Sequence, residues 1–430
     1  MTQSNFGSPT QYETTKIEID GEDIVGVFFS ISIFEDIYRP CVTGNIILQD
    51  TVTSNDGESY IEKRNLEFIE PIEIEFKNAM GHILSFKGVL NGLRNEYVKN
   101  SLKFYTVDFT SESVRENEKQ FVVKSFRDTP PERIVSEMVQ LVKGKLDSNT
   151  KGKNMQYLGS RKRPLDIVKY VCTHGLSQET EATEKGDERQ EKAKGSTGFL
   201  CWETCQGYNF ETINDVLSGK VGTEHKTYKT LLANRGRNME ETMKMIVRTE
   251  FNQIGDFQTK LRSGAFGGKN ISFDMDSGVY KEYTFYNKDS MTRKQRKAFP
   301  KDSISRYFCK PNDNQKFTNT CEKAQPLHGD QSRAYLTQNA GRQNTFSDQT
   351  GYFTLYPTFT IKAGDSFECQ INKPKDEKGG GGPDKKHSGK YAIQAVGHHL
   401  FADGKAYTKI KTIRSTTQQD ETSSVSSTQT

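Results

Sequence analysis

The feature that most constrains the fold is a strict alternation of apolar and charged residues. In Ile72–Lys77 (IEIEFK) every second side chain is apolar, which is typical of a β-strand with one buried and one wet face. Related patterns occur in residues 24–34, 42–48, 83–90 and 102–109. We therefore predict five or more antiparallel strands in residues 15–112, closed as a small barrel or sandwich because an open sheet would expose its edges.

The β pattern returns near the C-terminus. Strands are predicted at Tyr352–Ile361, Phe367–Ile371, Tyr391–Val396 and Tyr407–Ile413. The segment around Leu90–Val107 aligns loosely with that around Ala395–Ile410. Two similar β-domains would explain this faint repeat, although any two β-meanders resemble each other at this level.

The middle of the chain has helical periodicity. Thr129-Pro130-Pro131-Glu132 has the spacing of a capping box, which predicts a helix over about 130–143. A second helix is predicted from Pro164 to Gly175, where the glycine suits a left-handed helix end. A strand at Phe199–Glu203, a turn at Gly207 and a short helical stretch around Ile213 follow. Met239–Phe251 is compatible with either a strand or a helix.

These patterns divide the chain into six parts. They are an N-terminal arm (1–14), a first β-barrel (15–112), a helical and mixed α+β domain (113–217) with a mobile loop (177–197), a mixed segment with parts of the second barrel and a lower domain (218–345), second-barrel strands (346–414) with a hairpin tip (373–390), and a disordered polar tail (415–430). The expected fold class is mainly β with an α+β insert: two similar antiparallel β-barrels joined by a helical and mixed domain.

Composition excludes several classes of protein. Only 33% of the residues are hydrophobic and the mean hydropathy is −0.77. No run approaches the roughly 18 to 20 apolar residues of a bilayer-spanning helix, and residues 1–15 lack the pattern of a secretory signal, so we expect no membrane anchor. A net charge of +4 over 430 residues predicts no nucleic-acid partner. Seven scattered cysteines indicate reduced thiols rather than a disulfide framework.

Two groups of residues contain side chains that commonly bind metal ions. Cys201 and Cys205, with Cys172 and His174 as further candidates, lack the paired spacing of a structural zinc site, and we interpret them as buried or incidental thiols. His398 and His399 are adjacent in a predicted strand and so face opposite ways. They are expected to be surface or interface histidines.

Catalytic motifs are equally weak. Gly264–Lys269 (GAFGGK) has one residue too few for a phosphate-binding loop and lacks the following Ser or Thr. The carboxylates of Glu179–Glu191 lie in a polar loop that would not hold an acid and a base in register. Paired carboxylates could still meet in the fold, but no spacing points to them. We predict no catalytic residue, no cofactor and no metal site.

The order of these elements resembles a known family. Arg163-Pro164-Leu165-Asp166 opens a helix, Phe199–Glu203 (FLCWE) forms a strand, Gly207–Phe210 (GYNF) turns, and Ala363-Gly364-Asp365 lies in the second β region. Over about residues 15–415 this order resembles the central hub protein of contractile, myovirus-type phage-tail baseplates. That family also includes the hub part of type VI secretion spike proteins.

The resemblance implies a structural virion protein rather than an enzyme. Each subunit of a homotrimer would contribute two barrels to a pseudo-hexameric ring, which adapts a hexameric tail tube to a trimeric spike. Implied partners are the tail tube protein, the central spike protein and other baseplate (wedge) proteins, with DNA passing through the channel without specific binding. Assembly would occur in the host cytoplasm. The long loops 177–197 and 373–390 depart from a compact hub.

Two other functions remain open from the sequence. One is a tail-associated receptor-binding β protein, for which clustered exposed aromatic residues are expected. Trp202, the only tryptophan, instead lies in an apolar strand. The other is a cell-wall hydrolase, for which the sequence offers no recognisable acid and base pair.

Overall fold

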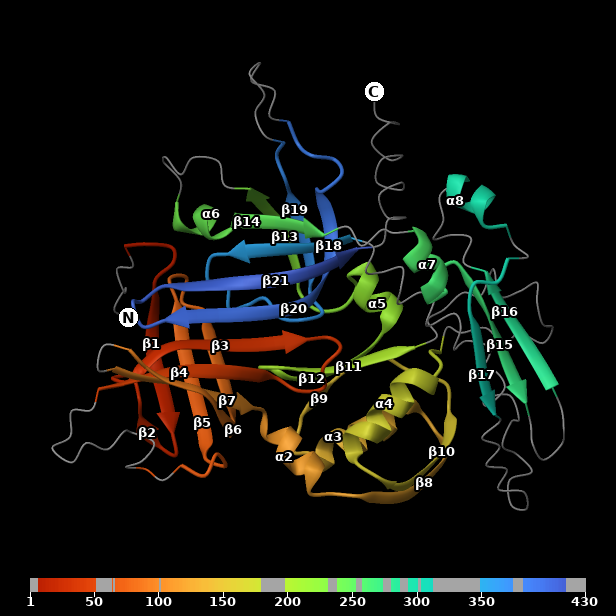
Figure 1. Cartoon of the computed structure of the whole chain (residues 1–430), viewed down its shortest axis with the longest axis horizontal. Coiled ribbons are helices and arrows are strands. Elements are labelled where there is room, and N and C mark those ends of the chain that lie inside the picture. The colour runs from red at the N-terminus through yellow and green to blue at the C-terminus, as the bar shows by residue number, and fades with distance from the viewer. Residues whose placement is uncertain are drawn as a thin grey trace.

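The structure is a computed structural model of the 430-residue chain. It describes residues 7–51, 64, 66–99, 102–178, 198–230, 238–252, 257–273, 280–286, 293–300, 303–311, 349–373 and 382–414. Two β-units lie side by side, a helical insert packs beside them, and a small separate sheet lies at one end (Figure 1). Residues 179–197 of the predicted mobile loop, residues 374–381 of the predicted hairpin tip and the predicted tail 415–430 lie outside the described residues.

The first β-unit consists of seven strands around an apolar core. They are β1 (Tyr12–Ile19), β2 (Glu22–Asp23), β3 (Phe28–Asp36), β4 (Thr43–Thr51), β5 (Pro71–Asn78), β6 (Ile83–Lys99) and β7 (Leu102–Thr110). The alternation that predicted β5 is confirmed, because Ile72, Ile74 and Phe76 are all buried. Side chains from β1 and β3 to β7 share one hydrophobic cluster. The sheet therefore curls around a common core.

The second β-unit consists of six strands that close into a barrel. They are β13 (Glu224–Thr230), β14 (Met245–Asn252), β18 (Gln349–Leu355), β19 (Ser366–Gln370), β20 (Gly389–Phe401) and β21 (Ala406–Arg414). The ring closes because β19 pairs with both β13 and β20. The pairings among the other five strands are all antiparallel. Strand β13 differs, because it runs parallel to both of its neighbours, β14 and β19. The predicted strand over Tyr352–Ile361 ends earlier, at Leu355.

The two units are joined edge to edge. Residues 395–401 of β20 pair antiparallel with residues 30–36 of β3. All thirteen strands of the two units therefore belong to one hydrogen-bonded sheet. The predicted fold class, two similar β-barrels joined by a helical and mixed domain, is confirmed at this level.

The faint sequence repeat has a counterpart in the strand order. Around the first unit the neighbours run β3-β4-β7-β6-β5-β1, and around the second they run β14-β18-β21-β20-β19-β13. If the six strands named for each unit are numbered by their order in the chain, both spatial orders read 2-3-6-5-4-1. Strand β3 therefore corresponds to β14, β6 to β20 and β7 to β21. The two units thus share the spatial order of all six strands, which favours a structural repeat over two unrelated meanders.

The insert packs helices against two small sheets. It contains α2 (Glu112–Glu118), β8 (Val122–Thr129), α3 (Pro131–Leu141), β9 (Leu146–Asp147), β10 (Met155–Lys162), α4 (Pro164–His174), β11 (Phe199–Thr204), β12 (Gly207–Thr212) and α5 (Ile213–Ser218). Both predicted helices form, and the apolar residues of α3 and α4 share a core with Phe199 and Phe210.

Two local predictions for these helices are wrong. The capping box does not form: Pro130 is the N-cap of α3, and the Glu132 carboxylate instead accepts a hydrogen bond from the Gly152 amide at 3.0 Å. Gly175, which ends α4, has an extended backbone with φ −67° rather than a left-handed one. Its small size is needed because a Cβ there would lie 2.9 Å from the Phe199 ring.

The segment left open in the sequence contains both element types. α6 (Met239–Met243) comes directly before β14. A separate three-stranded sheet follows, with the elements α7 (Phe257–Ser263), β15 (Gly267–Phe273), β16 (Tyr280–Tyr286), α8 (Arg293–Ala298) and β17 (Tyr307–Pro311). Within the described residues, no helix has the length and apolar character required to span a membrane.

Candidate assembly interfaces and the junction behind them

One buried carboxylate links all three parts of the molecule. Glu35 of β3 is 3% exposed and accepts hydrogen bonds from the amides of Cys205 at 2.8 Å and Ala363 at 3.0 Å. Cys205 belongs to the insert, and Ala363 precedes β19 of the second unit. Burial raises the pKa of Glu35. Because side chains alternate along a strand, Glu35 lies on the same core-facing side of β3 as Ile31 and Ile33. A charged residue at such a position indicates a buried polar contact, and this contact was not predicted from the sequence.

The two short motifs that carried the family resemblance meet at this junction. The indole Nε1 of Trp202 donates a hydrogen bond to the carbonyl of Ala363 at 2.9 Å. Gly364 has φ +92°, and a Cβ there would lie 2.4 Å from the Trp202 ring. Trp202 is 1% exposed, so this tryptophan positions the second unit against the insert and is not a receptor-binding surface residue.

The third residue of the second motif organises the loops around it. Asp365 is fully buried and accepts hydrogen bonds from the amides of Thr223 at 2.8 Å and Lys362 at 3.1 Å. Its Oδ2 also lies 2.9 Å from Nε2 of His225. The carboxylate thus holds the start of β13 beside β19, which is where the barrel closes.

A second acid ties the insert to the first unit. Glu203 accepts hydrogen bonds from the Val42 amide at 3.3 Å and the Ser113 hydroxyl at 3.2 Å, and also from the Ser111 hydroxyl. Burial raises the pKa of Glu203 to about 7. Because its hydrogen-bond donors come from Val42, Ser111 and Ser113, we interpret Glu203 as a connector between the insert and the first unit.

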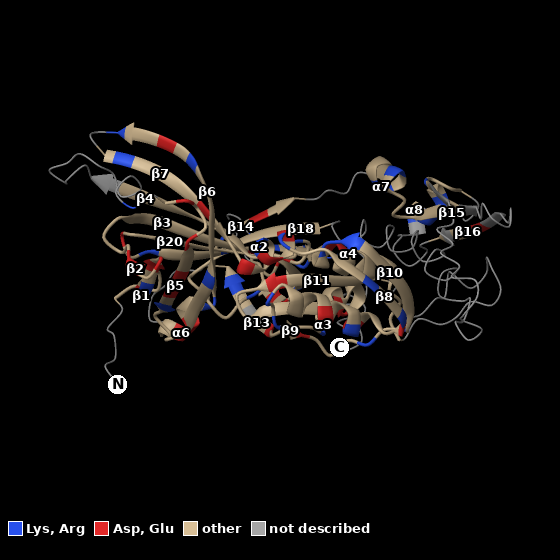
Figure 2. Ribbon diagram, turned by 90° about the horizontal axis from the view of Figure 1, so that it is seen from below, with Lys and Arg blue, Asp and Glu red and all other residues tan. Residues whose placement is uncertain are grey.

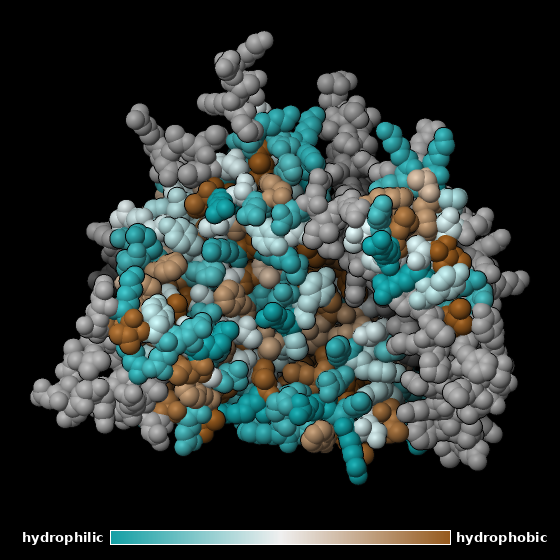
Figure 3. Space-filling model, in the orientation of Figure 1, coloured by the Kyte–Doolittle hydropathy of each residue, from teal (hydrophilic) through white to brown (hydrophobic). Residues whose placement is uncertain are grey.

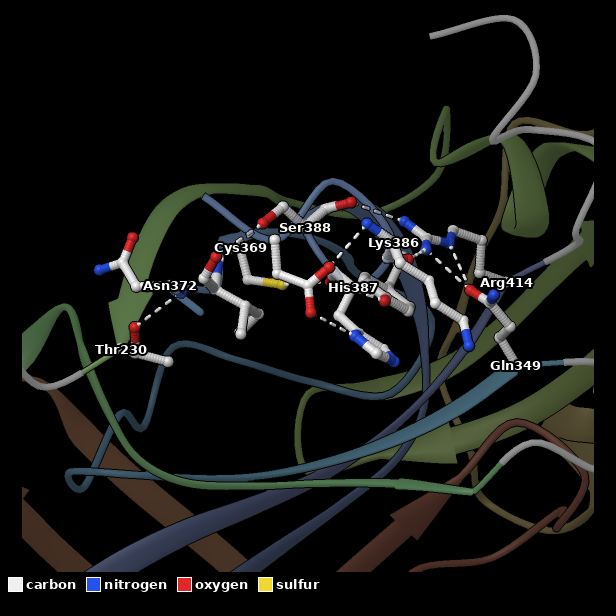
Figure 4. Close-up of polar contacts among 11 residues, drawn as sticks. Thr230, Gln349, Cys369, Asn372, Lys386, His387, Ser388 and Arg414 are labelled. Carbon is white, nitrogen blue, oxygen red and sulfur yellow. Dashed lines mark hydrogen bonds and ion pairs between the residues drawn. The ribbon is translucent and has the colours of Figure 1, made fainter. Parts of the chain in front are cut away.

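A buried arginine closes one mouth of the second barrel (Figure 4). The Arg414 guanidinium donates to Gln349 Oε1 at 2.7 and 3.1 Å, to the Ser388 carbonyl at 2.9 Å and to the Lys386 carbonyl at 2.7 Å. It also lies 4.3 Å over the Tyr391 ring. Burial lowers the pKa of Arg414, and its hydrogen bonds offset the cost of burying the charge.

The described part of the predicted hairpin tip folds over this mouth. His387 Nδ1 lies 2.7 Å from Asp384 Oδ2, and the imidazole packs 4.3 Å from the ring of Phe251. Ser388 Oγ accepts from the Ile371 amide at 2.9 Å. None of the residues 382–390 is fully buried, but the ends of the barrel strands offer this segment hydrogen-bonding groups.

The adjacent histidines face opposite sides of strand β20, and His399 contacts the first unit. Nδ1 of His399 lies 2.9 Å from the Ser32 hydroxyl, across the β20–β3 pairing. His398 faces the other way, is 2% exposed and lies 3.1 Å from Thr408 Oγ1. Burial lowers the pKa of His398 to about 3 and that of His399 to about 4. The prediction of a surface position for His398 is wrong, since Val396 and Leu400 place its face in the core.

Two strand segments of this sheet have a pairing partner on one side only among the described residues. Beyond residue 90, β6 pairs with β7 on one side, and its ladder with β5 ends at Val89. Beyond residue 246, β14 pairs with β18 on one side, and its ladder with β13 ends at Ile246. β6 and β7 rise from the body as a curved ribbon (Figure 2). On the face shown in Figure 3, hydrophobic residues are scattered among hydrophilic ones.

The face of the sheet opposite the barrel cores is hollowed and carries both charges. A depression of about 710 Å³ lies over β3, β14, β18, β20 and β21. Its charged lining includes Arg248, Glu250, Asp36, Lys409 and Lys411. Arg248 and Glu250 lie 3.7 Å apart as an exposed ion pair. The mixture of signs would not attract a polyanion strongly.

The remaining motifs have structural positions. Cys201 and Cys205 are free thiols that pack against different hydrophobic clusters, and Cys172 is also free. Gly264–Lys269 connects helix α7 to strand β15, the reverse of the strand-to-helix order of a phosphate-binding loop. Across the described residues, no group of three or more His, Cys, Asp or Glu side chains is placed to hold a metal ion.

Comparisons with known proteins give a consistent fold. A 43 kDa tail protein of prophage MuSo2 from Shewanella oneidensis aligns with 94% of this chain and 98% of its own, at 10% identity and a TM-score of 0.53. A tail protein from Neisseria meningitidis aligns with 94% of this chain and 97% of its own, at 9% identity and a TM-score of 0.54. The chain therefore has the fold of phage tail proteins. No family model matches the sequence, and no significant match exists among curated proteins.

The tail-protein fold extends over nearly the whole chain, so both β-units and the insert belong to it. A component of the type VI secretion system from E. coli aligns less well, with 8% identity, 94% of this chain and 76% of that chain covered, and a TM-score of 0.42. That score is too low to support an inference. The family resemblance drawn from element order is thus matched by the fold of solved tail proteins, and the sequence identities near 10% limit the agreement to fold.

Proposed function

We propose that this chain is a structural protein of a phage-type tail: a homotrimeric baseplate hub that connects the tail tube to the central spike. The observation that carries the proposal is the edge-to-edge joint between two units of the same strand order. A chain that already pairs one unit with the next is built for repetition around an axis. Three copies would present six similar units to a hexameric tube while offering threefold symmetry to a spike.

The dimensions of the sheet are compatible with a ring. Strands β14-β18-β21-β20-β3-β4-β7-β6 form a continuous run in which every neighbouring pair is antiparallel. At roughly 4.8 Å per strand, three such eight-stranded runs would give a circumference of about 115 Å and a backbone diameter of about 37 Å. That diameter leaves a side-chain-lined channel.

The channel would be the route by which DNA leaves the virion. The mixed charges of Arg248, Glu250, Asp36, Lys409 and Lys411 on the hollowed face suit a wall along which DNA slides without specific binding. The junction acids Glu35, Glu203 and Asp365 would hold the parts at fixed angles. In this proposal the protein catalyses no reaction, acts in the tail baseplate with wedge proteins as further partners, and assembles in the host cytoplasm.

The mass of the purified chain in solution tests the proposal. Light scattering should give three times the 48.8 kDa monomer mass, either for the chain alone or after the spike protein of the same tail is added. A chain that stays monomeric in both conditions would refute the hub. Binding to cell-surface receptors and activity on peptidoglycan would then be assayed, as tests of a receptor-binding protein and of a hydrolase.

A further inference from the structure

The positive charge of the chain is concentrated in the separate three-stranded sheet and its two helices. Residues 257–311, which run from α7 to β17, contain twelve lysines and arginines and five acids, a net charge of +7. The whole chain carries +4, so the rest of it carries −3. We call the elements α7 to β17 the basic unit. A charge asymmetry of this size indicates an anionic partner for the basic part of a chain.

A small aromatic core fixes both helices of the basic unit against its sheet. The ring of Phe266 lies 5.5 Å from that of Phe257 in α7 and 6.3 Å from that of Phe299, which directly follows α8. The Tyr286 hydroxyl of β16 donates a hydrogen bond to the Phe299 carbonyl at 2.9 Å. The two helices lie side by side at one end of the molecule (Figures 1 and 2). Their charged residues are therefore presented together.

Exposed cations from three parts of the basic unit form this surface. Arg306 donates a hydrogen bond to the Ser263 carbonyl at 3.0 Å, which places its guanidinium at the end of α7. Among the described residues of the unit the only acid is Glu282, and it is ion-paired with Lys269 of β15. The described part of the surface is therefore strongly basic. Its five exposed cations are Arg262, Lys294, Arg296, Lys297 and Arg306.

The basic residues of α8 are held together at a cost to the helix itself. Lys294 and Lys297 are three residues apart, and like charges close together on a helix lower its stability. α8 has only six residues, Arg293–Ala298, too few for a helix to be stable in isolation. Phe299, buried in the aromatic core, anchors it instead. A repulsive cluster that the fold holds in place indicates a function for its charge.

The class of anion follows from the side chains around these cations. α8 contains no apolar side chain larger than Ala298, whereas a helix that lies in a membrane surface needs an apolar face. A protein partner would need an apolar centre to the interface. Among the described residues of the basic unit, Tyr307, at 61%, is the one large hydrophobic side chain that is strongly exposed. The backbone of duplex DNA needs no apolar contact, because lysine and arginine alone neutralise its phosphates.

We propose that the basic unit binds the phosphate backbone of duplex DNA without reading its sequence. Each of the five exposed cations would neutralise about one phosphate, so the logarithm of the affinity should fall with the logarithm of the salt concentration with a slope of about −4. None of the five cations lines the hollowed face of the large sheet. The contact is thus additional to the proposed channel, and a monomer would display it as fully as a trimer.

Fluorescence anisotropy of a labelled 20-base-pair duplex, titrated with the full chain at several salt concentrations, tests the proposal. Two duplexes of unrelated sequence should bind equally. The triple variant Lys294→Glu, Arg296→Glu and Lys297→Glu should bind about 100-fold more weakly at low salt, with a salt slope smaller by about 3.

A matched control applies the same change of net charge to other parts of the molecule. It carries Lys87→Glu, Arg133→Glu and Lys220→Glu, whose native side chains are 73%, 72% and 73% exposed. The control should retain the salt slope of the wild-type chain and most of its affinity. All six substituted residues are exposed, so both variants are expected to fold, and circular dichroism verifies this.

Several results would overturn the proposal. One is equal weakening by the control and the test variant, which would mean that DNA responds to the overall charge alone. Another is tighter binding to vesicles that contain phosphatidylglycerol than to the duplex, which would indicate a lipid surface as the partner. A third is competition by polyglutamate as effective as that by unlabelled DNA, which would indicate an acidic protein. Light scattering of the same samples tests the hub separately, since DNA binding by a monomeric chain would refute the hub and leave this inference standing.

Discussion

The two β-units share a strand order, but among the described residues strand pairing closes a ring in the second unit alone. In the second unit β13 runs parallel to both neighbours and completes a six-stranded ring. In the first unit the corresponding strand, β1, runs antiparallel to β5, and β3 pairs on its outer side with β20. The first unit depends on a core rich in large apolar side chains, whereas the second adds a buried polar cluster at its mouth. The same strand order is thus compatible with a closed ring, where β13 pairs with β19, and with an edge that pairs with another unit, as β3 does with β20.

The largest expected effect comes from emptying either core. Phe109 in the first unit and Phe353 in the second are each 1% exposed, and truncating either phenylalanine to alanine should lower the free energy of unfolding by about 4 kcal/mol. Because the β20–β3 ladder makes one sheet of the two units, each variant should still unfold in a single transition. Thermal unfolding followed by circular dichroism measures this. Two separate transitions would show that the units are energetically independent.

The polar mouth distinguishes the second unit from the first. Arg414→Met should cost about 3 kcal/mol, because Gln349 and two carbonyls lose their buried donor. The matched control is Arg94→Met in the first unit, where the side chain is 61% exposed beside Asp108 and the expected cost is below about 0.5 kcal/mol. Denaturant unfolding of both variants provides the comparison. Equal costs would mean that Arg414 is not a structural element of the closure.

The link between the insert and the first unit should depend on pH. The pKa of Glu203 is raised to about 7 from an ordinary 4.5, so the folded state favours the protonated acid. Its contribution to stability is present below pH 4.5 and is lost as the pH rises toward 7. Relative to Glu203→Gln, the wild-type chain should lose about 3 kcal/mol of unfolding free energy between pH 4 and pH 8. Parallel pH profiles of the two proteins would contradict this.

The smallest expected effect lies on the open edge. Val98→Thr should change the unfolding free energy of the isolated chain by less than about 0.5 kcal/mol, because Val98 is 70% exposed. Leu400→Ala, on the paired strand β20 where Leu400 is fully buried, should cost about 3 kcal/mol. Unfolding at low protein concentration tests both. A large loss for Val98→Thr would place that side chain in a contact within one chain.

Local patterns were sufficient for strands β3 to β7 of the first unit and for α3 and α4. The period of two predicted β5 because its two faces meet different environments, and the helical period predicted α3 because one face is apolar. The same patterns also contain signals for buried polar residues. Glu35 and His398 both fall on core-facing positions of their strands, where a polar residue implies a buried partner.

The sequence by itself predicted strands β3 to β7 and β18 to β21, helices α3 and α4, and the absence of a long apolar span, and it indicated the repeat only faintly. Only the tertiary structure decided which acids lie together, which edges stay open and where the arginine lies. Glu35 bonds to Cys205 and Ala363, which are 170 and 328 residues away. Alternation is a local property that follows from the geometry of each strand. Pairings between distant strands depend instead on how the whole sheet closes, and no local window of sequence contains that information.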